Sequence, residues 1–161
     1  NIGLRTITNN YKSFSSGNKR DTIEINKEDF SLKILPLICY EIIYSGKIFK
    51  NLDFDLIINI SEDGWFGKSI GPKQHFIHSV FRAVESGKYL LRSANNGIAA
   101  IINPLGIVEQ KVEFGKSGYV DFKEGRKIQP TAFSRYGNKI FIILIFLYIF
   151  IIFSFNKITN E

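Results

Sequence analysis

The chain has 161 residues, a net charge of +6 and a single cysteine. This length suits about one domain. One cysteine excludes an intrachain disulfide and a zinc site built from cysteine pairs. The lysines and arginines are scattered and form no nucleic-acid motif, so we expect no nucleic-acid partner. The positive charge is more simply explained by attraction of the chain to anionic membrane headgroups.

The first part of the chain is polar, rich in Asn, Ser and Lys, and the whole chain lacks methionine. We therefore expect the C-terminal part of a longer protein, or the product of a split gene. Residues 1–30 are predicted to be a polar surface segment of a truncated domain.

The run SLKILPLI, residues 31–38, predicts a buried strand that ends at Cys39. The apolar spacing from Tyr40 to Asn51 makes a helix plausible there. A thiol at a helix N-terminus is favoured as the reactive thiolate. The alternative is that Cys39 is a small buried hydrophobe, as free cysteines often are.

The remaining apolar runs predict four more strands, at residues 56–60, 89–94, 98–103 and 107–112. Residues 61–73 form a glycine-rich loop, followed by a helix from Gln74 to Gly87. Its apolar residues on one face are predicted to pack on the sheet: Phe76, Val80, Phe81 and Val84. Strands that alternate with helices indicate an α/β fold.

Several side chains in this region carry hypotheses of their own. Trp65 and Phe66 could contact an acyl chain or a membrane, or could plug the loop onto the core. Arg82 and Glu85 have the spacing of a helical ion pair. Arg92 lies in an apolar strand and needs a partner if it is buried, for which Glu85 is one candidate.

Neither a metal nor a cofactor is expected. His75 and His78 have one spacing that metal sites use, with acidic residues nearby in the sequence. Helical histidines are nevertheless far more often surface or core groups than ligands.

Residues Ile140 to Phe155 carry no charge and are flanked by lysines. Their even hydrophobicity predicts a transmembrane helix, placed at residues 137–157 with a tail at 158–161. The alternatives are a buried core helix and an aggregation-prone β segment.

The motifs, in their order, resemble the nitrilase superfamily and, within it, the bacterial apolipoprotein N-acyltransferases. They are Cys39-Tyr40-Glu41, the loop segment SEDGWFG, Gly71-Pro72 with Gln74-His75, Arg82 with Glu85, and the segment LRSANNG. The resemblance implies the C-terminal part of a nitrilase-type α-β-β-α sandwich, with residues 31–136 as its C-terminal half, followed by one transmembrane helix.

The resemblance also implies a mechanism and partners. Cys39 would take an acyl group from a phospholipid and pass it to the N-terminal amine of a diacylglyceryl apolipoprotein, with Glu41 as a second catalytic group. Tyr40, Trp65 and Phe66 would contact substrate. The location implied is the bacterial inner membrane, with the catalytic domain on the periplasmic side, in contact with membrane lipids.

The family also uses a glutamate and a lysine that lie before the cysteine, in motifs that residues 1–38 do not match. We therefore expect this chain to be inactive alone and to need the missing N-terminal half. Two other hypotheses stay open: a nitrilase-type amidohydrolase fragment, in which water replaces the amine, and a non-catalytic remnant.

Overall fold

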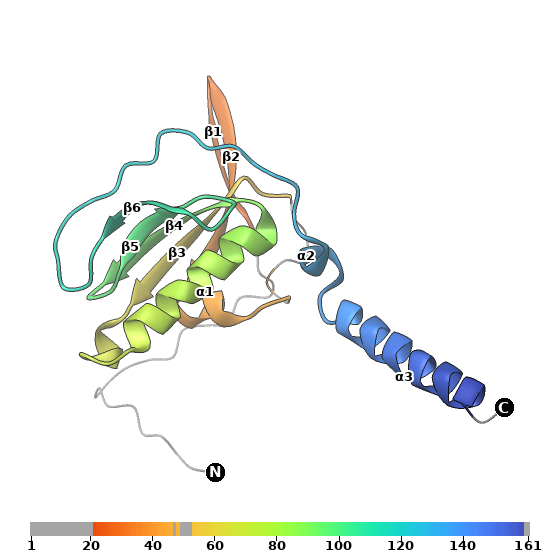
Figure 1. Ribbon diagram of the computed structural model, residues 1–161. Helices are drawn as coiled ribbons and strands as arrows, with labels where there is room; N and C mark the ends of the chain where they lie inside the picture. Colours follow the sequence, from red (N-terminus) through yellow and green to blue (C-terminus); the bar gives the residue numbers. More distant parts are fainter. Residues whose placement is uncertain (1–20, 47, 49–52, 160–161) are drawn as a thin grey trace, which may run out of the picture.

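The computed structural model describes residues 21–46, 48 and 53–159. They form a mixed six-stranded sheet with the strand order β1-β2-β3-β4-β5-β6 (Figure 1). Strands β2, β3 and β4 run parallel, and the other neighbours pair antiparallel. The strands are β1 (Ile23–Lys27), β2 (Phe30–Ile38), β3 (Leu56–Glu62), β4 (Tyr89–Asn95), β5 (Ala99–Ile102) and β6 (Val108–Val112).

One long helix, α1 (Gly71–Ser86), crosses one face of the sheet (Figure 1). Two 3₁₀ helices follow parallel strands: η1 (Cys39–Ile43) comes directly after β2, and η2 (Gly64–Phe66) comes soon after β3. The short α2 (Ala132–Tyr136) leads into α3 (Lys139–Thr159). The strands predicted from apolar runs are therefore confirmed, as is the α/β class.

The helix expected from Tyr40 to Asn51 is wrong over the described residues. Only the short helix η1 forms, and at Tyr44 the backbone is already extended, with φ −75° and ψ 101°. Residues 47 and 49–52 lie outside the described residues. The helix dipole at Cys39 is therefore weak, because a 3₁₀ helix this short has few aligned peptide groups.

The polar segment expected at residues 1–30 falls only partly within the described chain. Its residues 1–20 lie outside, while residues 23–27 form strand β1, which pairs with β2. All residues of β1 are exposed, as in an edge strand that packs on no second layer.

The predicted apolar face of the central helix is only half correct. Phe76 and Val80 pack against the core, but Phe81 is 54% exposed and Val84 is 37% exposed. The side of α1 that faces the sheet instead buries polar groups at helical spacing: His75, Ser79, Arg82 and Ser86. Polar side chains are stable there because most of them find hydrogen-bond partners, several of these on β3 and β4.

The core lies between α1 and the sheet. Its buried members are Leu35, Leu37, Ile42, Ile48, Phe54, Ile57, Ala83, Leu90, Ala100 and Ile102. On the opposite face of the sheet, the paired residues Ile38 and Ile60 are 68% and 58% exposed. The described chain thus has one helix-covered face and, around these two residues, an uncovered apolar patch.

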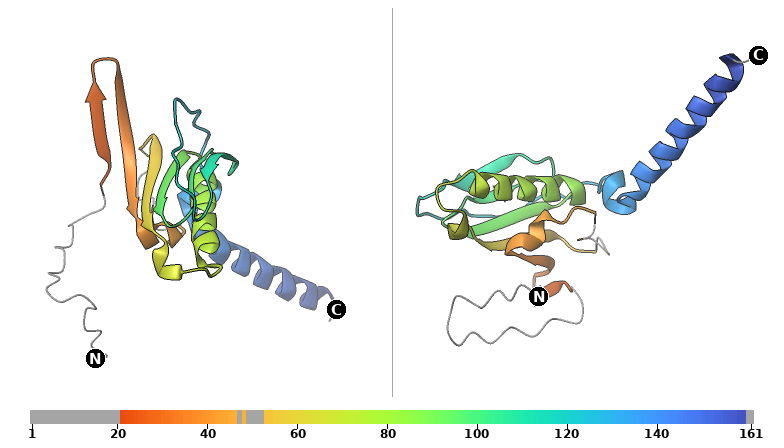
Figure 2. Two further views of the ribbon diagram at one scale, coloured as in Figure 1. Left: turned by 90° about the vertical axis from the view of Figure 1, so that its left-hand side faces the viewer. Right: turned by 90° about the horizontal axis from the view of Figure 1, so that it is seen from below.

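Helix α3 projects away from the sheet (Figure 2), and its described apolar side chains, such as Phe141 and Phe150, are exposed. Among the residues that the structure describes, no helix has both the length and the hydropathy that crossing a membrane requires. The transmembrane helix expected at residues 137–157 is therefore not supported by the described residues. A helix does form over this stretch, but the structure gives no support for a span.

Candidate active site

Cys39 lies where β2 ends and η1 begins, as its sequence position predicts. Its backbone has φ +50°, in the left-handed region that residues other than glycine seldom adopt. Strained backbone of this kind persists where surrounding contacts hold it, and it concentrates at functional sites. The side chain is half-buried, and the Cys39 Sγ atom lies 3.9 Å from Ser61 Oγ.

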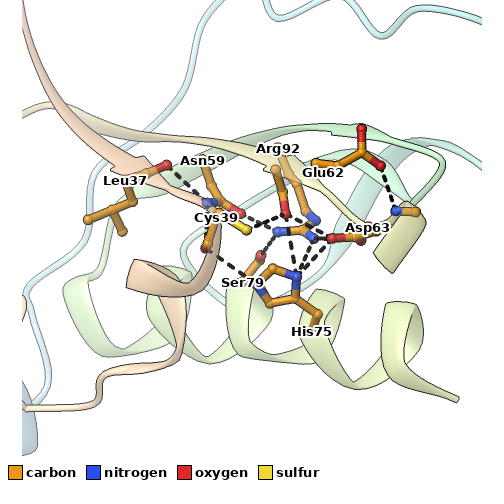
Figure 3. Close-up of polar contacts among 10 residues, drawn as sticks. Leu37, Cys39, Asn59, Glu62, Asp63, His75, Ser79 and Arg92 are labelled. Carbon is orange, nitrogen blue, oxygen red and sulfur yellow. Dashed lines mark hydrogen bonds and ion pairs between the residues drawn. The ribbon is translucent and has the colours of Figure 1, made fainter. Parts of the chain in front are cut away.

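The parallel register brings polar residues together beside this thiol. Asn59 on β3 is aligned with Leu37 on β2 and with Arg92 on β4. Asn59, Ser61 and Asp63 are spaced two residues apart, and side chains at that spacing lie on the same face of an extended chain. Here it is the face that α1 covers. Figure 3 shows Asn59, Asp63 and Arg92 converging with His75 of α1 below Cys39.

Asp63 is the centre of this buried group. Its Oδ1 atom lies 2.8 Å from His75 Nδ1 and accepts a 2.8 Å hydrogen bond from Ser61 Oγ. Arg92 Nη2 donates to both carboxylate oxygens, at 3.1 and 2.8 Å. The side chains of Asp63 and Arg92 have no exposed surface. We call Asn59, Ser61, Asp63, His75 and Arg92 the buried polar cluster.

The neighbours of the Asp63 carboxylate stabilise its negative charge. Burial by itself raises the pKa of Asp63, but the hydrogen bond to His75 and the attraction of Arg92 outweigh it and hold that pKa below its usual range. Burial lowers the pKa of Arg92, and the charge of Asp63 opposes this effect. Arg92 also donates to Asn59 Oδ1 and, at 3.3 Å, to Ser79 Oγ.

Two members of the cluster reach the backbone of the nucleophile candidate. Asn59 Nδ2 donates to the carbonyl oxygen of Leu37 at 3.0 Å and approaches that of Cys39 at 3.5 Å. His75 Nε2 lies 3.3 Å from the same Cys39 oxygen. The cluster therefore supports the peptide that carries the thiol.

Glu41 and Tyr40, both predicted site residues, lie on η1. Glu41 Oε2 accepts a 2.7 Å hydrogen bond from the backbone N–H of Ile38, so the carboxylate ties the end of β2 to the start of η1. The Tyr40 ring is 51% exposed and stacks on His75, with centroids 5.0 Å apart and an angle of 22° between the planes.

Phe66 and Trp65, the other predicted contacts of substrate, behave differently. Phe66 is half-buried and meets His75 edge to face at 5.7 Å, beside Tyr40 at 6.0 Å. Trp65 is 83% exposed. The idea that this loop plugs onto the core therefore fails for Trp65, whereas Phe66 closes one side of the site.

A sequence model of the carbon-nitrogen hydrolase family matches residues 7–120. The chain belongs to this carbon-nitrogen hydrolase family. Its fold is also similar to that of Saccharomyces cerevisiae Nit3, a member of branch 10 of the nitrilase superfamily, with a TM-score of 0.51 and 19% sequence identity. This match covers 64% of the chain and 40% of Nit3, and it shows the nitrilase-like fold alone.

Curated relatives of this carbon-nitrogen hydrolase chain include the apolipoprotein N-acyltransferase of Rickettsia bellii, which is 43% identical over 157 residues. That alignment covers 96% of the chain and 30% of the relative. The apolipoprotein N-acyltransferase of Rickettsia prowazekii is 44% identical over 134 residues, 82% of the chain and 27% of the relative. The chain therefore spans less than a third of the length of these relatives.

Sequence reasoning found the thiol of this family member but missed most of the buried polar cluster. It required a partner for Arg92 and named Glu85, whereas the partner is Asp63. Glu85 binds Arg82 at 2.9 Å, which confirms that predicted pair, and accepts from the Gly46 N–H at 2.9 Å. The signal that was available is the two-residue spacing of Asn59 and Ser61 on β3 and of Asp63 directly after it.

Proposed function

We propose that this chain carries the nucleophile of an N-acyltransferase that acts on diacylglyceryl apolipoproteins. Cys39 is the nucleophile and the phospholipid is the acyl donor. The observation that carries the proposal is the Cys39 thiol, held half-buried in a left-handed turn at a parallel strand end, beside a buried polar cluster. The names of the relatives supply the substrate class.

The proposed reaction has two steps. Cys39 gives up its thiol proton and its sulfur attacks an ester carbonyl of the phospholipid; the ester C–O bond breaks, and the lysophospholipid oxygen leaves with that proton. The α-amine of the lipoprotein then attacks the thioester, the C–S bond breaks, and an amide forms while the proton from the amine returns to the thiol. A difficult acyl transfer is thereby divided into two easier steps.

Glu41 is proposed to act beside the thiol, and its contact with the Ile38 N–H keeps it at the base of η1. Tyr40, Phe66 and Trp65 are proposed to contact the substrate lipid. Trp65 supports this role because its ring is exposed, and aromatic rings with a polar tip suit the membrane interface.

A phospholipid donor requires access to a membrane surface. By its resemblance we assign the chain to the periplasmic side of the bacterial inner membrane, and we propose that the exposed apolar side chains of α3 contact lipid. Vesicle flotation tests this part: the chain should float with phosphatidylethanolamine vesicles and lose this behaviour when residues 139–159 are deleted.

We also propose that residues 1–161 do not turn over alone. Within the described chain, the polar contacts of Cys39 come from Asn59, Ser61 and His75, and none comes from a lysine. A base and an oxyanion donor are each typically worth about 10²-fold or more in rate. An N-terminal half is the proposed partner, and the uncovered patch around Ile38 and Ile60 is a suitable apolar surface for it.

The test is a chimera in which residues 1–161 replace the matching segment of the Rickettsia bellii relative. We expect the chimera to N-acylate a diacylglyceryl peptide and residues 1–161 alone to be inactive. The Cys39→Ala chimera is the matched control and should be inactive. Acyl transfer by that control would refute Cys39 as the nucleophile, and release of free fatty acid without amide would show that water, and not the amine, resolves the thioester.

A further inference from the structure

A second carboxylate, Glu62, lies next to Asp63 but does not belong to the buried polar cluster. It is the last residue of β3, and its side chain is half-buried beside η2. Its Oε1 atom accepts a 2.6 Å hydrogen bond from the backbone N–H of Gly64, the first residue of η2. In Figure 3 the Glu62 carboxylate points toward η2, whereas Asp63 points toward His75.

The same carboxylate also binds the turn that follows β4. The register of β3 and β4 places Glu62 opposite Asn95, and the side-chain amide of Asn95 donates to Glu62 Oε2. The hydrogen bond from the Gly64 N–H, followed by those from Asn95 and Asn96, lowers the pKa of Glu62, while burial opposes this effect. The carboxylate is therefore ionised at neutral pH and acts only as an acceptor.

The segment that Glu62 holds carries two of the proposed substrate contacts. Phe66 turns inward and its ring meets that of His75 at 5.7 Å, whereas Trp65 is exposed. A 3₁₀ helix of three residues has little stability of its own, so contacts from outside must fix its orientation. The Glu62 carboxylate supplies such a contact at the first residue of η2.

We propose that Glu62 is a positioning residue whose carboxylate clamps η2 to the turn after β4 and holds Trp65 in the orientation from which it meets lipid. The inference rests on the proposed contact of Trp65 with lipid. A carboxylate suits this task because hydrogen bonds to an ionised acceptor are stronger than neutral ones. Without the clamp, η2 would have to be ordered whenever Trp65 meets lipid, and that loss of conformational entropy would weaken the contact.

Gly64 offers a second way to break the clamp. A Cβ atom at this position would lie 2.5 Å from Glu62 Oε1 and 3.3 Å from Asn96 Nδ2. The Glu62 side chain is flexible, so Gly64→Ala should push the carboxylate off the Gly64 N–H and leave its charge in place. Gly64 is not among the residues with a positive φ, so the backbone accepts alanine. This variant therefore separates the clamp from the charge of Glu62.

Backbone ¹⁵N relaxation of the chain in detergent micelles tests the clamp. The order parameters of η2 should be about 0.85 in the unaltered chain and below about 0.6 in Glu62→Ala and Gly64→Ala. Glu62→Gln should keep the order, because its amide oxygen still accepts from the Gly64 N–H and Asn95 can turn its own amide to match. The matched control is Glu113→Ala, which removes a glutamate paired with Lys111 and should leave η2 unchanged.

A measurement on the unaltered chain covers the case in which a variant fails to fold. The Gly64 amide hydrogen should exchange at least about tenfold more slowly than in the unfolded chain, because it donates to an ionised carboxylate. Exchange at the rate of the unfolded chain would overturn the clamp whatever the variants do.

The contact with lipid has its own readout, because Trp65 is the only tryptophan of the chain. Chains bound to phosphatidylethanolamine vesicles with brominated acyl chains lose fluorescence where the indole ring touches lipid. We expect quenching in the unaltered chain and in Glu62→Gln, and at least about twofold less quenching in Glu62→Ala and Gly64→Ala. A merely structural Glu62 would lower the melting temperature and leave the quenching as it is.

The outcomes separate this inference from the proposed function. Quenching that is present and equal in the unaltered chain and in folded Glu62→Ala would overturn the role of Glu62 alone. No quenching in the unaltered chain would overturn both the proposed lipid contact of Trp65 and this role. Neither measurement requires acyl transfer, so both stand apart from the test of Cys39 in the chimera.

Discussion

The substitution Arg92→Met tests how far the buried polar cluster determines stability. Methionine replaces the apolar stem of the arginine but removes every donor of the guanidinium and leaves the space of that group unfilled. Asp63 then keeps only Ser61 and His75 as partners, and Asn59 Oδ1 loses its Arg92 donor. Breaking a buried ion pair by removing one partner costs about 3–5 kcal/mol, because the remaining charge stays in a site without water.

For a chain of 161 residues this cost corresponds to a melting temperature lower by about 9–15 °C, at about 3 °C per kcal/mol. Differential scanning calorimetry or thermal circular dichroism measures it. The matched control is Lys111→Met, which removes an ion pair with Glu113 whose side chains are half exposed, so water already screens it and the midpoint should hardly move. Equal, small shifts for both variants would refute the argument that Arg92 neutralises a buried charge.

Three further predictions follow from the same contacts. The pKa of Asp63 is lowered in the folded chain, so its ionised form stabilises the fold above the usual carboxyl pKa of about 4, and this stabilisation is lost as the pH falls through the folded pKa. The free energy of unfolding, measured with urea, should therefore fall between about pH 5 and about pH 2, and it should fall less in Asp63→Asn. Gly97→Ala should destabilise the chain by about 1–3 kcal/mol, since a Cβ there collides with Asp63 Oδ2, and an unchanged urea midpoint would count against that close packing. Glu41→Gln should keep the melting temperature, because the amide oxygen can still accept from the Ile38 N–H, and should slow acyl transfer in the chimera at least about tenfold; an unchanged rate would leave Glu41 with its structural contact alone.

The strands were predictable because their apolar runs are long and bounded by polar residues. Leu35 and Leu37 of β2, and Ile57 of β3, occupy the core as such runs suggest. The position of Cys39 at a strand end followed directly from the same pattern. Its left-handed backbone did not, since nothing in the local sequence around a cysteine specifies a positive φ.

The central helix shows where hydrophobic periodicity misleads. Apolar residues suggested the buried face, but His75 and Arg82 are buried whereas Phe81 is exposed. Their burial depends on partners that tertiary structure brings in, such as Asp63, directly after β3, for His75. Pairing with a residue outside the helix cannot be inferred from the spacing of that helix alone.

The terminal helix shows a different limit. The uncharged run from Ile140 does form α3, so the helix itself was predictable, but the described residues give no support for the span expected from it. The composition of this run indicates that its side chains belong in apolar surroundings. It does not indicate whether lipid or protein provides them.

The central claim is that Cys39 accepts the acyl group, and the mass of the Cys39 peptide tests it most directly. The chimera is incubated with phosphatidylethanolamine in the absence of the lipoprotein acceptor, digested at low pH and analysed by mass spectrometry. The account predicts one acyl chain on the Cys39 peptide, removed by neutral hydroxylamine as a thioester is, and no acylated peptide in the Cys39→Ala chimera. An acyl chain on another residue, or undiminished acylation in the Cys39→Ala chimera, would contradict it.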